Sequence, residues 1–186
     1  MSLRKIKVCD SIKTVQKMLD IERKIPVLHN INELEMLNED EKLSKREFLS
    51  LYQALKEIEI WETATWEEKQ LLAPILEVKY DNNNCPVVIF PYFEPLETEE
   101  TIFRYDEDEI PIELQKRLLT KGMTDEAIGD FLNNLTNFCY KYDLNEEDII
   151  LNFNNLGWNK AFGVRIIDYG LTNEMMERFF NNEALL

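Results

Sequence analysis

The chain has 186 residues, of which 45% are hydrophobic and 11% aromatic, so it can bury the core of one domain of ordinary size. Its formal net charge is −15, from 36 acidic and 21 basic residues. This charge argues against nucleic acid and anionic membranes as partners, because both are bound by cationic surfaces.

The N-terminal part of the chain is expected to be mostly helical. A short strand is expected at Ile6–Val8, and residues 10–24 then place apolar side chains at helical spacing. A second helix is expected over 30–41, where Asn30 and Glu33 have the spacing of a capping pair.

Capping boxes predict the start of two further helices. Ser44 and Glu47 form the first box, and Thr65 and Glu68 form the second, which opens a short helix that Pro74 closes. The apolar stripe of the first of these helices comprises Phe48, Leu51, Leu55 and Ile58.

The middle of the chain predicts a β-hairpin. Residues 75–80 alternate between apolar and polar side chains, and 81–84 have the composition of a turn. The continuous apolar run over 86–93 is typical of a strand that is buried on both faces.

Two helices, a second hairpin and a closing helix complete the expected order. The helices are predicted over 112–119 and 124–142, after a polar connector at 94–111. Trp158 is expected in the loop of the late hairpin, and the closing helix over 173–186. Helices, hairpin, helices, hairpin and helix in this order predict an α+β fold.

The cysteines predict neither disulfides nor a zinc site. Cys9, Cys85 and Cys139 are far apart and odd in number, and the chain has only one histidine. Each is expected to be a small buried hydrophobe. No apolar run reaches 18 residues and the first residues resemble no signal peptide, so a cytoplasmic location is expected.

Two short motifs late in the chain carry a family resemblance. The stretch "YDLNEEDIIL" resembles the catalytic loop of protein kinases, and "VRIIDYGL" resembles the strand that ends in their metal-binding D-F-G. From Ser44 to Thr172 the order of elements is similar to a reduced, degenerate protein-kinase-like fold. The resemblance implies a single domain, with a small helix-plus-hairpin lobe over 1–95 and a truncated, mainly helical lobe over 96–186.

The resemblance implies roles for three acids. Asp143 stands where the family has its catalytic base, which accepts a proton from a hydroxyl nucleophile. Asp148 and Asp168 stand where the family binds Mg²⁺ and, through it, the phosphates of ATP. Mg²⁺ and ATP are therefore the implied cofactors.

The resemblance also implies an adenine-facing strand end and a phosphate-pairing lysine. The main chain at Phe90, Tyr92 and Phe93 would face the adenine. In the family, a strand lysine pairs with a glutamate of the regulatory helix. Lys24 and Glu47 are the nearest candidates, although the capping box already explains Glu47.

Departures from the family favour a regulator or an atypical phosphotransferase over an active protein kinase. All five glycines follow position 121, so no glycine-rich loop precedes the hairpin. Lys141 and Tyr142 replace the family's His-Arg before Asp143, and Asp148 replaces an asparagine. The 186-residue chain continues for only 16 residues beyond Gly170, which leaves no platform for a protein substrate.

Two functions remain open. One is a degenerate kinase-like protein that binds nucleotide and Mg²⁺ weakly. The other is an acidic interaction or inhibitor module, a charge mimic without catalysis, that binds a basic face of a protein partner. Each of the three acids also has a plain interpretation as a turn former or a solvated side chain. Trp158 is a candidate partner contact if it is exposed; the alternative is a loop anchor.

Overall fold

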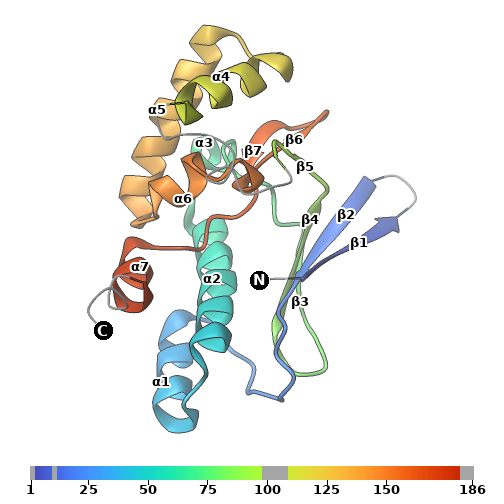
Figure 1. Cartoon of the computed structure of the whole chain (residues 1–186). Coiled ribbons are helices and arrows are strands. Elements are labelled where there is room, and N and C mark those ends of the chain that lie inside the picture. Colours follow the sequence, from blue (N-terminus) through green and yellow to red (C-terminus); the bar gives the residue numbers. More distant parts are fainter. Residues whose placement is uncertain (1–2, 10–11, 98–108, 181–186) are drawn as a thin grey trace. The chain divides into compact units, whose positions relative to one another are not determined.

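The computed structural model describes residues 3–9, 12–97 and 109–180 (Figure 1). These residues form a mixed α+β fold of seven α-helices and two small antiparallel sheets, which confirms the α+β part of the predicted fold class. They divide into two compact units. The first contains the described residues up to Thr63, Pro74–Tyr92 and the chain from Met175; the second contains Ala64–Ala73 and Phe93–Glu174.

A four-stranded antiparallel sheet forms one layer of the first unit. Its strands are β1 (Leu3–Cys9), β2 (Ile12–Met18), β3 (Glu77–Tyr80) and β4 (Pro86–Pro91), in the order β1-β2-β4-β3. All six residues of β4 are buried, whereas β3 is largely exposed at the edge. The middle hairpin is therefore confirmed, with β4 as the strand buried on both faces.

The predicted helix over 10–24 is wrong, because the described residues there form strand β2. This strand pairs with β1 on one side and, from Thr14 to Lys17, with β4 on the other. Val15, Lys17 and Leu19 are buried while the residues between them are only partly covered, a period of two. Pairing with two neighbouring strands overrides a sequence that also fits a helical period.

The predicted caps open both long helices of the first unit. Asn30 caps α1 (Ile31–Glu41) by accepting a hydrogen bond from a backbone N–H of the first turn. At the start of α2 (Lys45–Thr63), the Ser44 N–H donates to the Glu47 carboxylate at 2.9 Å, and the Glu47 N–H donates back to the Ser44 hydroxyl at 3.3 Å. These reciprocal bonds are the predicted capping box.

The apolar stripe of α2 covers the sheet and also meets the last helix. Phe48, Leu51 and Leu55 are buried, and α2 packs against β4 (Figure 1). The closing helix α7 is confirmed over Asn173–Phe179, and its Phe179 ring lies 5.5 Å from that of Phe48.

The second unit holds the remaining helices and a three-stranded sheet. The helices are α3 (Trp66–Lys69), α4 (Ile110–Thr120), α5 (Asp125–Tyr142) and α6 (Glu146–Ile150), with a 3₁₀ turn, η2, at Phe153–Asn155. The strands β5 (Glu94–Pro95), β6 (Leu156–Asn159) and β7 (Gly163–Ile166) are antiparallel in that order. No helix within the described ranges has the length and apolar composition of a membrane span. Most of the predicted connector, 98–108, lies outside the described residues.

Trp158 lies in strand β6 and not, as predicted, in the loop of the late hairpin. It is half-buried, and the Lys121 ammonium lies 5.1 Å from the centre of its ring. The loop is the three-residue turn 160–162, and Gly163 follows it with a φ of 73°. A positive φ after a three-residue loop is typical of a tight hairpin, and glycine adopts it without strain.

The prediction of unpaired, buried cysteines is confirmed for two of them. Cys85 and Cys139 are free and buried. Burial raises the pKa of the Cys85 thiol to about 11 and that of the Cys139 thiol to about 12, so both stay protonated at neutral pH. The side chain of Cys9 lies outside the described residues.

Candidate functional site

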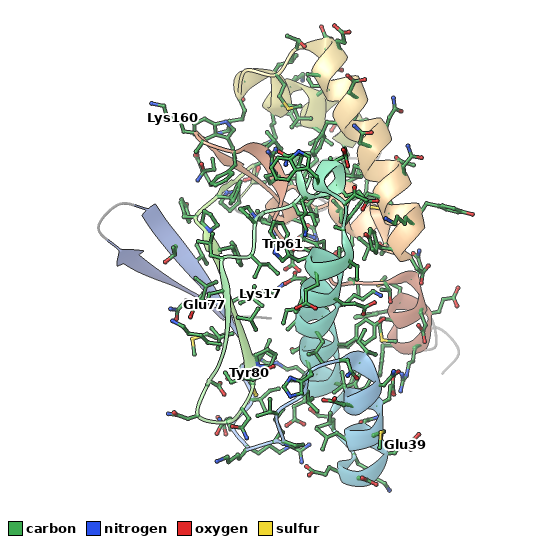
Figure 2. The ribbon with its side chains drawn as sticks, turned by 180° about the vertical axis from the view of Figure 1, so that it is seen from behind. Lys17, Glu39, Trp61, Glu77, Tyr80 and Lys160 are labelled. Carbon is green, nitrogen blue, oxygen red and sulfur yellow. The ribbon has the colours of Figure 1, made fainter. Side chains whose placement is uncertain are left out.

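A buried ion pair joins the sheet and the helix of the first unit. Lys17 of β2 donates from Nζ to Glu57 Oε1 of α2 at 2.6 Å, and the two side chains are only 3% and 4% exposed. Figure 2 labels Lys17, which lies between the strands and α2. Apolar residues would fill such a position at no cost in stability, because burying two charges carries a large desolvation penalty. The pair is therefore a candidate for a functional role.

The two residues that the sequence suggested for a lysine–glutamate pair, Lys24 and Glu47, do not bond to each other. Lys24 is exposed in the irregular segment after β2. Glu47 caps α2 and accepts a hydrogen bond from Arg23 Nε at 3.1 Å. The lysine–glutamate pairing proposed between Lys24 and Glu47 is thus wrong.

One sequence signal can locate Lys17. In a strand, Val15, Lys17 and Leu19 fall on one face, so the lysine occupies an inward position between two apolar residues. An inward lysine requires a buried acid, and Glu57 is the acid that α2 places among its buried residues. The helical interpretation of 10–24 hides this pattern.

Asp143 ends helix α5 with its backbone in the left-handed region, at a φ of 54°. Its side chain is exposed. Its carbonyl oxygen accepts from the N–H of Asn173 at 2.9 Å, and its Oδ1 accepts from the Asn173 amide at 3.1 Å. The acid is thus held by a residue 30 positions later in the chain.

Further bonds fix the segment after Asp143 against the segment after Asp168. Leu144 forms a bridge with Thr172, and the N–H of Asn145 donates to the carbonyl oxygen of Leu171 at 3.0 Å. The two sequence motifs therefore lie side by side in the second unit.

Asp148 is linked to the strand that leads to Asp168. Its N–H donates to Asn145 Oδ1 at 2.7 Å, which caps α6. The Asn155 amide donates to Asp148 Oδ2 at 3.2 Å and to its carbonyl oxygen at 2.8 Å. The Asn155 carbonyl oxygen in turn accepts from the N–H of Ile167 at 2.8 Å.

Asp168 follows β7 directly after Ile167, and it is half-buried. Tyr169 and Gly170 behind it are buried, so the Asp-Tyr-Gly turn is packed into the unit and not looped out into solvent. Within the parts of the chain that the structure describes, no three Asp, Glu, His or Cys side chains gather into a group that could hold a metal ion.

Asp148 and Asp168 are the acids of the two motifs whose oxygens could serve as metal ligands. Mg²⁺ keeps several waters and is bound by one or two carboxylates together with substrate phosphates, and seldom by a cage of protein ligands. Two such carboxylates could hold the metal only together with phosphate oxygens.

Lys141 and Tyr142, the two residues before Asp143, are both bonded to Glu68 of the cap of α3. Lys141 Nζ donates to Glu68 Oε1 at 2.7 Å, and the Tyr142 hydroxyl donates to Oε2 at 3.1 Å. Burial raises the pKa of Glu68, but the hydrogen bonds from Lys141, Thr65 and Tyr142 outweigh it and hold the pKa below its usual value. These two residues anchor the end of α5 to α3.

The proposed adenine-facing residues are the end of strand β4 and the two residues that follow it. Phe90 is the fifth residue of β4 and pairs with Val15, so its main chain is part of the ladder. Tyr92 and Phe93 lie in neither strand, which leaves their peptide groups outside both ladders. The Phe93 ring is buried in the second unit, 5.9 Å from that of Phe162.

Comparison with known proteins supplies no relative. No family model matches the chain, and searches among curated proteins and among solved structures find no match.

Proposed function

We propose that the chain is a reduced protein-kinase-like protein that binds a nucleotide with Mg²⁺ and acts as a regulator or an atypical phosphotransferase. The buried Lys17–Glu57 pair carries this proposal. In protein kinases a lysine on a strand of the small sheet pairs with a glutamate of the neighbouring helix, and this pair must form for phosphates to be held. The strand lysine Lys17, bonded to the helix glutamate Glu57 at 2.6 Å, supports the proposal because it has the same pairing of residue types and elements.

Each acid receives a role in this proposal. Asp168 and Asp148 hold Mg²⁺, which neutralises charge on the phosphates. Asp143 accepts the proton of a hydroxyl nucleophile in the phosphotransferase version of the function. Asn173 orients the exposed carboxylate of Asp143, and a hydroxyl substrate can reach this carboxylate from solvent.

The adenine is assigned to the main chain near Phe90, Tyr92 and Phe93. A backbone peptide group can donate to and accept from a heterocycle without any particular side chain. No glycine-rich loop precedes the sheet hairpin, so the phosphates lack the usual backbone cradle. We therefore assign a modest affinity for nucleotide.

A thermal-shift titration with ATP and MgCl₂ tests the function. At ten times the dissociation constant, binding stabilises the fold by about 1.4 kcal/mol, which raises Tm by about 3–6 °C for a chain of this size. Asp168→Asn is expected to abolish the shift. Asp130→Asn removes the same charge from an exposed position in α5 and should retain it. No shift for the wild type, or the same shift in Asp168→Asn, refutes the proposal.

The net charge of −15 favours a second candidate, an acidic module that binds a basic face of a protein partner without chemistry. Such binding weakens steeply as salt screens the charges. A partner captured by the chain should then dissociate between low and moderate salt, and substitution of Asp143, Asp148 and Asp168 together should leave its affinity unchanged. Retention at high salt excludes this candidate.

A further inference from the structure

One segment of this acidic chain contains no acid at all. Over residues 149–167 there is no Asp or Glu, although the chain has 36 acids among 186 residues. The same segment carries two cations, Lys160 and Arg165. It spans η2 and the β6–β7 hairpin, so the hairpin is a positively charged island in a protein of net charge −15.

Arg165 differs from the other arginines that the structure describes. Arg23, Arg46, Arg117 and Arg178 each donate to at least one carboxylate at 3.4 Å or less. Arg165 has no carboxylate partner among the described residues. Its one hydrogen bond runs from Nη1 to the carbonyl oxygen of its own neighbour, Val164, at 2.8 Å.

Two glycines lie beside Arg165 on the hairpin. Gly157 lies opposite Arg165 in the β6–β7 register, and Gly163 is two residues before it on the same face. The Arg165 Nη1 lies 3.8 Å from the point that a Cβ on Gly163 would occupy. The side chain is half-buried, and none of its nitrogens is both buried and unsatisfied, so its remaining N–H groups face solvent.

A half-buried guanidinium without an anion is an unfavourable arrangement. Desolvation lowers the pKa of Arg165, and no acid in the described chain opposes this effect. Neutral residues would occupy the strand position without that cost. The guanidinium presents a planar fork of donors that matches the two oxygens of a carboxylate or phosphate group.

We propose that the β6–β7 hairpin binds an oxyanion, the carboxylate or phosphate group of a small molecule, with Arg165 as its bidentate donor. Lys160, exposed at the hairpin turn (Figure 2), adds long-range attraction for the same charge. The site is separate from the nucleotide proposal, because it depends on neither Lys17 nor the three acids.

Two-dimensional NMR of the ¹⁵N-labelled chain tests the site. Sodium phosphate and sodium acetate are titrated separately, with NaCl holding the ionic strength constant. Saturable shifts are expected at the Arg165 Nε–H and at the amides of 157–165, and the salt that produces them identifies the kind of oxyanion. Shifts that are centred elsewhere, or that never saturate with either salt, overturn the proposal.

Variants separate Arg165 from general charge effects. Arg165→Gln should weaken binding by about tenfold or more, because a hydrogen bond to a charged group contributes roughly 1.5–3 kcal/mol. Arg46→Gln, which removes an exposed arginine from α2, should bind as the wild type does. Equal binding by Arg165→Gln contradicts the proposal. Lys17→Met/Glu57→Leu, the double variant expected to recover most of the stability, should keep the hairpin shifts, so failure of the nucleotide proposal leaves this one standing. If Arg165→Gln does not fold, the position of the saturable wild-type shifts, at 157–165 or elsewhere, decides whether the proposal stands.

Discussion

At the residue scale, the most informative feature is a charge placed where apolar residues would be expected. Lys17 and Glu57 are each almost inaccessible to water, and each satisfies the other. Breaking one partner of a buried pair leaves a lone buried charge, whereas replacing both removes the desolvation cost as well. If the double replacement recovers the stability that a single replacement loses, the ion pair is not kept for stability, and a functional role is favoured.

Lys17→Met is expected to destabilise the chain by about 3–5 kcal/mol, because the Glu57 carboxylate loses its cation in a buried position. The double variant Lys17→Met/Glu57→Leu should recover most of that loss. Urea unfolding measures both. A double variant that is as unstable as the single one would mean that the pair itself stabilises the fold.

A second residue-scale prediction concerns Gly157. A Cβ at this position would lie 2.7 Å from Phe93 Cβ and 3.0 Å from Ile167 Cγ2, which is too close for carbon atoms. Gly157→Ala should therefore cost about 1–3 kcal/mol through displacement of the neighbouring strand segments.

Gly129 of α5 supplies the matched control for Gly157. Nothing lies within 4 Å of a Cβ there, and the position is an exposed helix interior. Gly129→Ala should stabilise the chain by about 0.5–1 kcal/mol, since alanine has the higher helix propensity. Chemical unfolding of the two variants should give opposite signs; the same sign for both would contradict the packing around Gly157.

At the element scale, local signals and tertiary pairing determine different parts of the structure. The capping boxes at Ser44 and Thr65 and the hairpin over β3 and β4 follow from neighbouring residues alone, and the sequence predicts them. Strand β2 pairs with β1, which directly precedes it, and with β4, which lies far along the chain; this second pairing has no signal in a local window of sequence.

The residues of the candidate site also differ in whether the local sequence reveals them. Asp143, Asp148 and Asp168 are found from motifs that are local in sequence, whereas Lys17 becomes visible only once β2 is known to be a strand. The link from Asp148 through Asn155 to Ile167 carries no sequence signal. An asparagine in a polar run has too many alternative uses for its partner to be inferred.

The capping box of α2 gives a pH-dependent prediction. The hydrogen bond from the Ser44 N–H, then that from the Ser44 hydroxyl, and the nearby Arg23 lower the pKa of Glu47 below its usual value of 4.5. A carboxyl whose folded pKa is depressed stabilises the fold above the unfolded pKa, and this contribution disappears as pH falls through the folded pKa.

Glu47→Gln should therefore be less stable than the wild type at pH 7, with a difference that shrinks as the pH falls below about 4.5. Glu39→Gln, an exposed glutamate of α1 (Figure 2), controls for the change in net charge. Denaturant midpoints measured from pH 7 to pH 3 give the comparison. A difference between Glu47→Gln and the wild type that is constant over this range would show that the carboxylate contributes nothing beyond its shape.

At the scale of the whole molecule, the negative net charge disfavours the anionic ligand that the proposed function requires. The net charge of −15 argues against polyanions as general partners, yet the proposed ligand is a polyanionic nucleotide. Mg²⁺ resolves the conflict, since it neutralises phosphates before they meet carboxylates. Asp148 and Asp168 are thus compatible with a nucleotide only in the presence of the metal, and the affinity for ATP alone should be negligible.

The most direct measurement of this account is NMR of the labelled chain with ATP and trace Mn²⁺, whose unpaired electrons broaden nearby resonances. The account predicts broadening at the amides of 143–148 and 167–170 only when both ATP and metal are present. Broadening that needs no ATP, or that spreads over exposed acids such as those of α1, would contradict it.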